Sequence, residues 1–309
     1  MKLLVAGGAG FLGSHLCDAL LRSDNHVIAV DNFHTGRREN IKHLEKNPNF
    51  ELVEADVTEP LNLNVDGIFN FACPASPIQY QVDPVRTMIT NVQGSINLLR
   101  LALANDARIL QASTSEVYGD ALQHPQEETY WGNVNPIGIR ACYDEGKRAA
   151  ETLYFDFYRQ YGVDIRVARI FNTYGPRMAH NDGRVVTNFI SQALKNEPIT
   201  VFGNGLQTRS FCYVDDLVEG IIKLFSSNLV ATPVNLGNPS PVNMITLASE
   251  IIELCNSTSQ IVFQPLPGDD PKDREPDVKK AKQLLNWEAK RDRKTGLADT
   301  IRYQRTQSI

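Results

Sequence analysis

The sequence contains a tyrosine and a lysine four residues apart, Tyr143 and Lys147, within a segment of helical pattern. Residues at this spacing share one face of a helix, so the lysine ammonium is expected to lie near the phenol. A positive charge there favours the phenolate form and lowers the pKa of the tyrosine from about 10 toward the pH at which the enzyme would work. The pair predicts a general base for a sugar hydroxyl. An ordinary amphipathic helix can contain the same pair, so the spacing alone leaves both interpretations open.

A cluster of hydroxyl and carboxyl groups, Ser113-Thr114-Ser115-Glu116, stands at the end of the strand-like run ARILQAS. Open α/β sheets place their chemistry at the carboxyl ends of their strands. Thr114 can share the hydroxyl proton with Tyr143, and Glu116 adds a carboxylate beside it. The alternative is a capping cluster of Ser and Thr with no chemical role.

A glycine-rich segment, GGAGFLG at residues 7–13, connects the first strand-like run to a helical pattern. Glycines bring backbone N–H groups against a pyrophosphate, and the helix N-terminus supplies positive potential. The spacing fits both GxGxxG and GxxGxxG, so the subtype stays open. Asp31 follows at the end of the second strand, where it would bind ribose hydroxyls and repel a 2′-phosphate. We therefore expect NAD, although Arg37 and Arg38 are close enough in sequence to accept such a phosphate.

Alternating strand-like and helical patterns must position these residues. The apolar runs cover 2–6, 26–31, 50–56, 67–72, 107–113 and 164–170, and the clearest helices cover about 12–22, 84–105 and 142–161. This alternation predicts an α/β fold, a Rossmann-type doubly wound parallel sheet with a smaller C-terminal substrate-binding region. We expect an NAD-binding domain at 1–171, rejoined by about 208–237, and a sugar-nucleotide-binding region at 172–309 that includes the Pro- and charge-rich segment 265–277.

The composition narrows the class of partner. The chain has 309 residues and a formal net charge of −5, with no long block of Lys and Arg, so a surface for nucleic acid has little support. The five cysteines are scattered without metal-ligand spacing, so we expect neither a disulfide framework nor a metal site. No apolar run has the length of a membrane span, and a strand begins at residue 2, so we expect a cytoplasmic protein without a membrane partner.

The glycine-rich segment, the Ser/Thr/Glu cluster at residues 113–116 and the Tyr143/Lys147 pair are together typical of a short-chain dehydrogenase/reductase site. Longer blocks make the resemblance specific and cover essentially the whole chain. These are GGAGFLGSHL, VDNFHTGRRENI, DVTEPL, ACPASPIQYQ, STSEVYGD, HPQEETYWGNVNPIG, CYDEGKR, RIFNTYGPRM, DGRVVTNF and TRSFCYVDDLVEG. The chain resembles the UDP-glucuronate decarboxylases, also called UDP-xylose synthases, which are extended short-chain dehydrogenases/reductases.

The resemblance implies an enzyme that oxidises C4 of UDP-glucuronate with NAD⁺, using Tyr143 as the base. The resulting C4 ketone makes the C5 carboxylate a β-keto acid, so carbon dioxide leaves, and return of the hydride to C4 gives UDP-xylose. Glu116 is expected to position the sugar or a proton-delivering water. The resemblance also implies a homodimer formed through the helices at 84–105 and 142–161.

Binding residues are carried over from the same resemblance. The cofactor-binding residues are expected to be Gly7, Gly10, Phe11, Leu12, Gly13, Asp31, Asn32, Thr35, Gly36, Asp56, Val57, Ala72, Tyr143 and Lys147. Among them, Asp31, Asn32 and Thr35 would meet the adenosine ribose, Asp56 and Val57 the adenine, and Ala72 and Lys147 the nicotinamide side. The candidates for the sugar nucleotide are Tyr80, Ser115, Asn172, Arg177, Arg184, Asn188, Arg209 and Arg274.

Three alternatives are weighed against this interpretation. A nucleotide-sugar 4,6-dehydratase needs an acid to expel the C6 hydroxyl, commonly an Asp directly after the catalytic Thr, and this chain has Ser115 there. A 4-epimerase shares the C4 oxidation, but its pattern lacks a glutamate at the position of Glu116. A non-catalytic NAD-binding sensor on the same fold would be free to lose Thr114, Tyr143 and Lys147, and all three are present.

Overall fold

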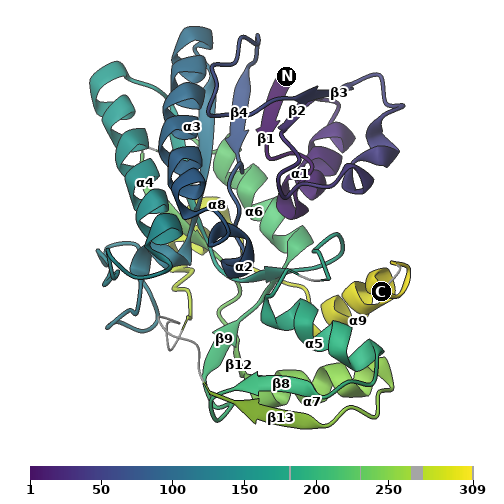
Figure 1. Ribbon diagram of the computed structural model, residues 1–309. Coiled ribbons are helices and arrows are strands. Elements are labelled where there is room, and N and C mark those ends of the chain that lie inside the picture. The colour runs from purple at the N-terminus through teal and green to yellow at the C-terminus, as the bar shows by residue number, and fades with distance from the viewer. Residues whose placement is uncertain (181, 230, 266–273, 308–309) are drawn as a thin grey trace.

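A seven-stranded sheet forms the centre of the computed structural model, which describes residues 1–180, 182–229, 231–265 and 274–307 (Figure 1). All its pairings are parallel, in the order β11-β6-β5-β4-β1-β2-β3. The strands are β1 (Lys2–Ala6), β2 (His26–Asp31), β3 (Phe50–Glu54), β4 (Gly67–Asn70), β5 (Arg108–Thr114), β6 (Ile165–Ile170) and β11 (Pro233–Leu236). The chain builds outward from β1 in both directions, which confirms the Rossmann-type doubly wound fold.

The apolar runs form buried strands because helices cover both faces of the sheet. Every residue of β4 is buried, and so are all but the first of β1 and β2, whereas the edge strand β3 is only half-buried. Two predicted strands end earlier than expected, at Glu54 and Asn70. After each of these residues the chain leaves the ladder, and residues 55–57 and 71–77 line a cavity instead.

Two pairs of helices cover the sheet. On one face, α1 (Phe11–Arg22) and α6 (Val214–Ser226) contribute Leu16, Leu217 and Ile221 to one apolar core. On the other face, α3 (Pro84–Asn105) and α4 (Ala141–Tyr161) contribute Leu98 and Tyr154 to a second core. The long α3 and α4 lie side by side (Figure 1). The predicted positions of the three clearest helices agree with α1, α3 and α4.

After β6 the chain forms mainly short elements, most of which lie below the sheet in Figure 1. The helices are α5 (Val185–Leu194), α7 (Met244–Cys255), α8 (Lys279–Leu285) and α9 (Arg293–Arg305), and the strands are β7 (Thr173–Tyr174), β8 (Ile199–Phe202), β9 (Thr208–Ser210), β10 (Cys212–Tyr213), β12 (Pro241–Asn243) and β13 (Ile261–Gln264). The short α2 (Pro77–Tyr80) belongs to the N-terminal half, between β4 and α3. The chain returns to the sheet through α6 and β11, both within 208–237. The division at residue 171 stays a prediction, and most of the segment 265–277 lies outside the described residues.

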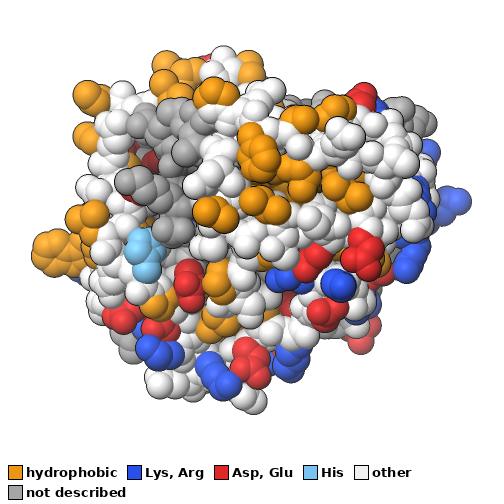
Figure 2. Space-filling model, turned by 90° about the horizontal axis from the view of Figure 1, so that it is seen from below, with side chains coloured by type: hydrophobic (Ala, Val, Ile, Leu, Met, Phe, Trp, Pro, Cys, Tyr) orange, Lys and Arg blue, Asp and Glu red, His pale blue; other side chains and the backbone are white. Residues whose placement is uncertain are grey.

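The small β8/β13 sheet packs on α5 and α7. It also contributes to the lower surface of the molecule, where apolar side chains are exposed among charged ones (Figure 2). The exposed large apolar residues of this sheet and the turn after β8 are Phe202, Leu206, Val262 and Phe263. Thr200 and Phe202 also line the cavity, so this sheet forms part of the wall of the site.

Candidate active site

A cavity of about 900 Å³ opens at the carboxyl edge of the sheet, between the sheet and the C-terminal elements. Its lining includes every residue proposed from the sequence for cofactor, catalysis or substrate. They are Gly7, Gly10, Phe11, Leu12, Gly13, Asp31, Asn32, Thr35, Gly36, Asp56, Val57, Ala72, Tyr80, Thr114, Ser115, Glu116, Tyr143, Lys147, Asn172, Arg177, Arg184, Asn188, Arg209 and Arg274. The fold therefore brings these residues to one cavity, while their individual roles stay predictions.

The turn between β1 and α1 requires glycine. Gly7 has φ of +77°, and a Cβ atom on Gly13 would lie 2.1 Å from the Gly7 carbonyl oxygen. The N-cap residue Gly10 provides no side-chain hydrogen bond, so the N–H groups of the first helical turn remain available for another acceptor. A close backbone turn with free N–H groups fits the pyrophosphate of a dinucleotide.

Asp31 closes this turn from the end of β2. Its carboxylate accepts hydrogen bonds from the backbone N–H of Ala9 and of Phe33, both at 2.9 Å. Burial raises the pKa of Asp31, and the same two hydrogen bonds oppose the rise. A Cβ atom on Gly36 would lie 2.6 Å from the Asp31 carboxylate, so this loop must pass close to the acid.

Of the two arginines that could receive a 2′-phosphate, Arg38 is paired elsewhere and Arg37 lines the cavity. Arg37 donates to the carbonyl of Arg177 at 3.3 Å. Arg38 pairs with Glu54 and lies over the Phe33 ring, 4.2 Å from its centre. With the carboxylate of Asp31 at the end of β2, this arrangement supports a ribose with free hydroxyls and therefore NAD.

The predicted adenine-side residue Asp56 is also held firmly. Burial alone would raise the pKa of Asp56, but hydrogen bonds from Thr58 and Asn32 and the charge of Arg86 lower it to about 2. Arg86, on α3, forms an ion pair with Asp56. The carboxylate therefore stays ionised and fixes the loop after β3 against α3.

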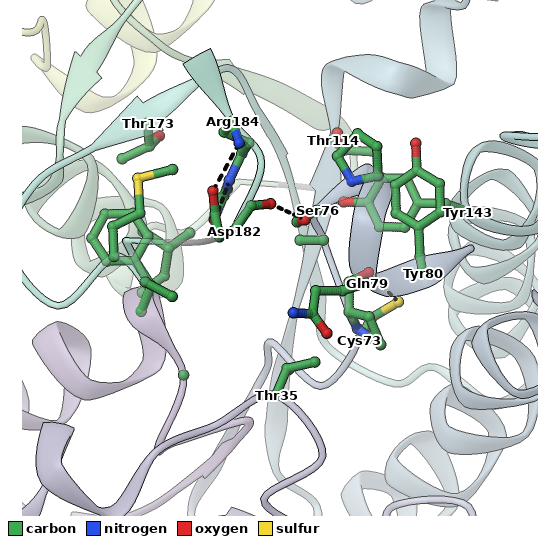
Figure 3. A pocket seen from close by; sticks show the side chains of 18 of the residues that line it. Thr35, Cys73, Ser76, Gln79, Tyr80, Thr114, Tyr143, Thr173, Asp182 and Arg184 are labelled. Atoms are coloured by element: carbon green, nitrogen blue, oxygen red, sulfur yellow. Dashed lines mark hydrogen bonds and ion pairs between the residues drawn. The ribbon is translucent and has the colours of Figure 1, made fainter. Parts of the chain in front are cut away.

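The tyrosine and lysine of α4 line the cavity at the end of β5, and Figure 3 shows Tyr143. The Tyr143 ring stacks on Tyr80, with 4.9 Å between ring centres and 6° between planes. Lys147 Nζ donates to the carbonyl of Ala112 at 2.9 Å and lies 5.7 Å from the centre of the Tyr143 ring. Thr114 stands beside the two rings in Figure 3 and caps the backbone N–H of Glu116 at 3.2 Å.

The expected lowering of the Tyr143 pKa is wrong for this structure. Burial, followed by the neighbouring Cys73 and Glu116, raises the pKa of Tyr143 well above its ordinary value, and a hydrogen bond with Thr114 opposes the rise. Lys147 is also buried, and burial lowers its own pKa. Burial therefore shifts both members of the Tyr143/Lys147 pair toward their neutral forms.

Glu116 is the centre of a buried charge cluster that the sequence did not reveal. Its carboxylate binds Arg140 at 2.6 Å and Arg274 at 3.0 and 3.1 Å. Asp144, one turn after Arg140, lies 4.0 Å from the Arg140 guanidinium. Burial and the charge of Glu116 raise the pKa of Asp144 to about 7, against the opposing charges of Arg140 and Arg274. Arg140 and Asp144 flank Tyr143 in the segment RACYD at residues 140–144, and their i, i+4 spacing was the available signal.

The arginines predicted to bind the sugar nucleotide differ in how they are held. Arg177 pairs with Asp18 of α1 at 2.6 Å, so its charge is already compensated. Arg184 pairs with Asp182 immediately before α5 (Figure 3). Arg274 binds Glu116, as described above. The partners of Arg177 and Arg274 come from distant segments of the chain, so the sequence could name these two arginines but not their pairing.

Loops on opposite sides of the cavity also meet directly. The Ser76 hydroxyl, just before α2, donates to the carbonyl of Asp182, just before α5 (Figure 3). Cys73 and Gln79 line the same side. Sequence reasoning missed these wall residues, although they lie in the ACPASPIQYQ block quoted for the resemblance.

The fold and this site define an NAD-dependent enzyme of the short-chain dehydrogenase/reductase type. The chain belongs to the NAD dependent epimerase/dehydratase family, whose model matches residues 3–237. Among curated proteins, it is 56% identical over 297 residues to UDP-glucuronic acid decarboxylase 1 of Arabidopsis thaliana, covering 96% of this chain and 68% of that protein. It is also 56% identical to UDP-glucuronic acid decarboxylase 3 of the same plant, covering 96% of this chain and 87% of that protein.

A solved structure shows the same fold with ligands in place. UDP-glucuronic acid 4-epimerase of Bacillus cereus, in complex with UDP-glucuronic acid and NAD, superposes with a TM-score of 0.88 at 27% identity, covering 99% of each chain. The comparisons thus confirm the resemblance to the UDP-glucuronate decarboxylases that the sequence predicted. Within the described residues, no helix has both the length and the apolar character needed to cross a membrane.

Proposed function

We propose that the protein converts UDP-glucuronate to UDP-xylose with loss of carbon dioxide. The observation that carries the proposal is the 56% identity to UDP-glucuronic acid decarboxylases over 96% of the chain. The arrangement of Thr114, Glu116 and Tyr143 around one cavity supports it. The 4-epimerase of Bacillus cereus has a lower identity, 27%, and its structure contains the same nucleotide sugar, so the two reactions must be separated by product.

Tyr143 takes the proton of the C4 hydroxyl, and Thr114 shares that proton through its own hydroxyl. Lys147 holds positive charge beneath the phenol while its ammonium remains fixed on the Ala112 carbonyl. Bound NAD⁺ would accept the hydride from C4 and return it after decarboxylation, so it ends oxidised as it began. The stacked Tyr80 limits movement of the Tyr143 ring during these proton transfers.

Decarboxylation follows from the position of the ketone. With C4 oxidised, the C5 carboxylate belongs to a β-keto acid, and the electrons of the breaking bond are delocalised into the ketone. Protonation of the resulting enolate at C5 gives the 4-keto pentose, and return of the hydride to C4 gives UDP-xylose. Glu116, held by Arg140 and Arg274, positions the sugar or the water that delivers this proton.

The binding residues divide along the cavity. The glycine-rich turn and Asp31 hold the pyrophosphate and the adenosine ribose, and the loops after β3 and β4 flank the adenine and nicotinamide sides. The substrate side contains Tyr80, Ser115, Asn172, Arg177, Arg184, Asn188, Arg209 and Arg274. Of these, Arg177 has a compensated charge and contributes mainly by holding its loop.

The test is incubation of the purified protein with UDP-glucuronate and NAD⁺, followed by mass spectrometry and NMR of the nucleotide sugar. UDP-xylose with release of carbon dioxide supports the proposal. An isomer of unchanged mass identifies a 4-epimerase, and no turnover of any nucleotide sugar with NAD⁺ bound identifies a sensor. Tyr143→Phe should abolish product formation while NAD⁺ still binds, whereas Tyr158→Phe, an exposed change on the same helix, should retain activity.

A homodimer and a cytoplasmic location belong to the same proposal. Exposed apolar side chains on α3 and α4, namely Val85, Ile89, Leu103, Tyr158 and Tyr161, support association through these helices. All five cysteines are free, which supports a reducing compartment. Light scattering after size exclusion should give twice the chain mass, and a monomer at micromolar concentration would contradict the dimer.

A further inference from the structure

A buried acid lies one helical turn beyond the lysine of the site. Glu151, on α4, follows Lys147 by four residues, and it is only 8% exposed. Arg169, on β6, binds its carboxylate with two nitrogens, at 3.0 and 2.8 Å. The Ser113 hydroxyl donates to it at 2.5 Å. A carboxylate this deep in the molecule is stable only because these groups bind it from two strands.

These contacts connect Glu151 to the residues that hold the reacting groups. Ser113 directly precedes Thr114 on β5, and the carbonyl before it, of Ala112, accepts the hydrogen bond from Lys147. One carboxylate therefore ties the end of β5 to the turn of α4 that directly follows Lys147. A shift of the Glu151 side chain would therefore displace both Thr114, through Ser113, and Lys147, through α4.

The groups that shift the pKa of Lys147 also indicate a role for Glu151. Burial lowers the pKa of Lys147, and Cys73 and Glu151 are the groups that oppose this fall. Burial also raises the pKa of the Cys73 thiol, which is therefore neutral at neutral pH. The negative charge near Lys147 therefore comes from the Glu151 carboxylate, which forms an ion pair with Arg169.

Arg169 keeps that negative charge in place from the opposite side. Its third nitrogen donates to the Tyr118 hydroxyl at 3.0 Å and to the Glu128 carbonyl at 3.1 Å. The Tyr118 hydroxyl in turn donates to the side-chain oxygen of Asn235 on β11 at 2.7 Å. The guanidinium is thus fixed by groups that do not reach the cavity, so Glu151 cannot swing toward the ligands.

We propose that Glu151 is a positioning residue, held by Arg169 and Ser113, that keeps Lys147 charged and fixed beneath Tyr143. Its kinetic consequence rests on the proposed function, whereas its effect on the titration of Lys147 does not. The charge of Lys147 matters because it supports the phenolate and the nicotinamide ribose site together.

The direct test follows the titration of Lys147 by NMR of ¹³Cε-labelled lysine, with the resonance assigned by its loss in Lys147→Met. In Glu151→Gln the midpoint should fall by about one to two pH units, as expected for unit charges one helical turn apart at an effective dielectric constant of about 20. Glu151→Asp, which keeps the charge, should restore most of the difference. Glu145→Gln removes a charge from the exposed side of α4 and should change nothing.

Enzyme kinetics supply the second readout. In Glu151→Gln the alkaline limb of the kcat profile should move to lower pH with a smaller change in KM. An unchanged Lys147 midpoint in a folded Glu151→Gln protein would overturn the inference. If that variant does not fold, Glu151→Gln with Arg169→Met removes both buried charges. The midpoint should then still fall, but by less than about one pH unit, because the lost positive charge of Arg169 partly offsets the lost negative charge of Glu151, and an unchanged midpoint would overturn the inference. A wild-type protein that titrates as expected but leaves UDP-glucuronate intact would reject only the proposed function.

Discussion

Replacement of Asp144 by Asn should stabilise the protein above neutral pH. Burial and the charge of Glu116 raise the pKa of this carboxyl from 3.8 to about 7. One of its oxygens, Oδ1, is buried without a hydrogen-bond partner among the described residues. An ionised Asp144 is therefore costly in the folded protein, and the isosteric amide removes that cost.

The sign and the size of the stability change in Asp144→Asn follow from the linkage between folding and proton binding. Between pH 4 and 7 the unfolded chain ionises Asp144 while the folded protein keeps it protonated, so stability falls as pH rises through this window and is constant above it. A difference of about 3 pKa units corresponds to about 4 kcal/mol at pH 8.5 and about 2 kcal/mol at pH 5.5. The stability gained by Asp144→Asn should therefore grow by about 2 kcal/mol between these two values.

Urea unfolding at pH 5.5, 7.0 and 8.5 measures this difference directly. Asp156→Asn is a matched control, because Asp156 lies on the same helix with an exposed side chain paired to Arg159. The control should give the same small difference at every pH. Parallel stability curves for wild type and Asp144→Asn would refute the argument, since they would mean that Asp144 is ionised in the folded protein at pH 5.5.

Two further substitutions test the glycine-rich turn at residues 7–13 and the buried charge cluster around Glu116. Gly13→Ala should weaken NAD⁺ binding by about tenfold or more, because the new methyl group would lie 2.1 Å from the Gly7 carbonyl oxygen; calorimetric titration measures this, and undiminished affinity would contradict the geometry of the turn. Arg140→Met should lower the free energy of unfolding by about 3 kcal/mol in urea unfolding, because Glu116 loses its 2.6 Å partner in a buried site. The control Arg159→Met, on the exposed side of α4, should have little effect in the same assay.

Local spacing explains which parts of the site the sequence predicted. The glycine turn and Asp31 occupy consecutive elements, and Tyr143 and Lys147 share one helix, so the pattern within a short segment fixes their relative positions. The fold class followed from the alternation of apolar runs and helices in the same way. The strand β11 was harder to place, because Pro233–Leu236 is short and joins β6 after a long excursion through the C-terminal half.

Pairings across the fold could not be read from the sequence. Arg177 was expected at the substrate, and the structure pairs it with Asp18, which lies 159 positions earlier. The effect of Lys147 on the Tyr143 pKa was expected from spacing alone, and burial reverses it. In both cases the missing quantity was the environment: the partner brought by another element, or the water that packing excludes.

The same reasoning applies to Glu116, and here the environment bears on the substrate. A lone glutamate beside the reacting sugar would repel a substrate carboxylate. In the structure Glu116 is surrounded by Arg140 and Arg274, and Asp144 has a pKa of about 7. With two arginines and one or two ionised acids, the cluster has a net charge between zero and +1 at neutral pH. A wall of that charge accepts an acidic sugar, so the pairing that sequence reasoning missed removes the main electrostatic objection to a carboxylate substrate.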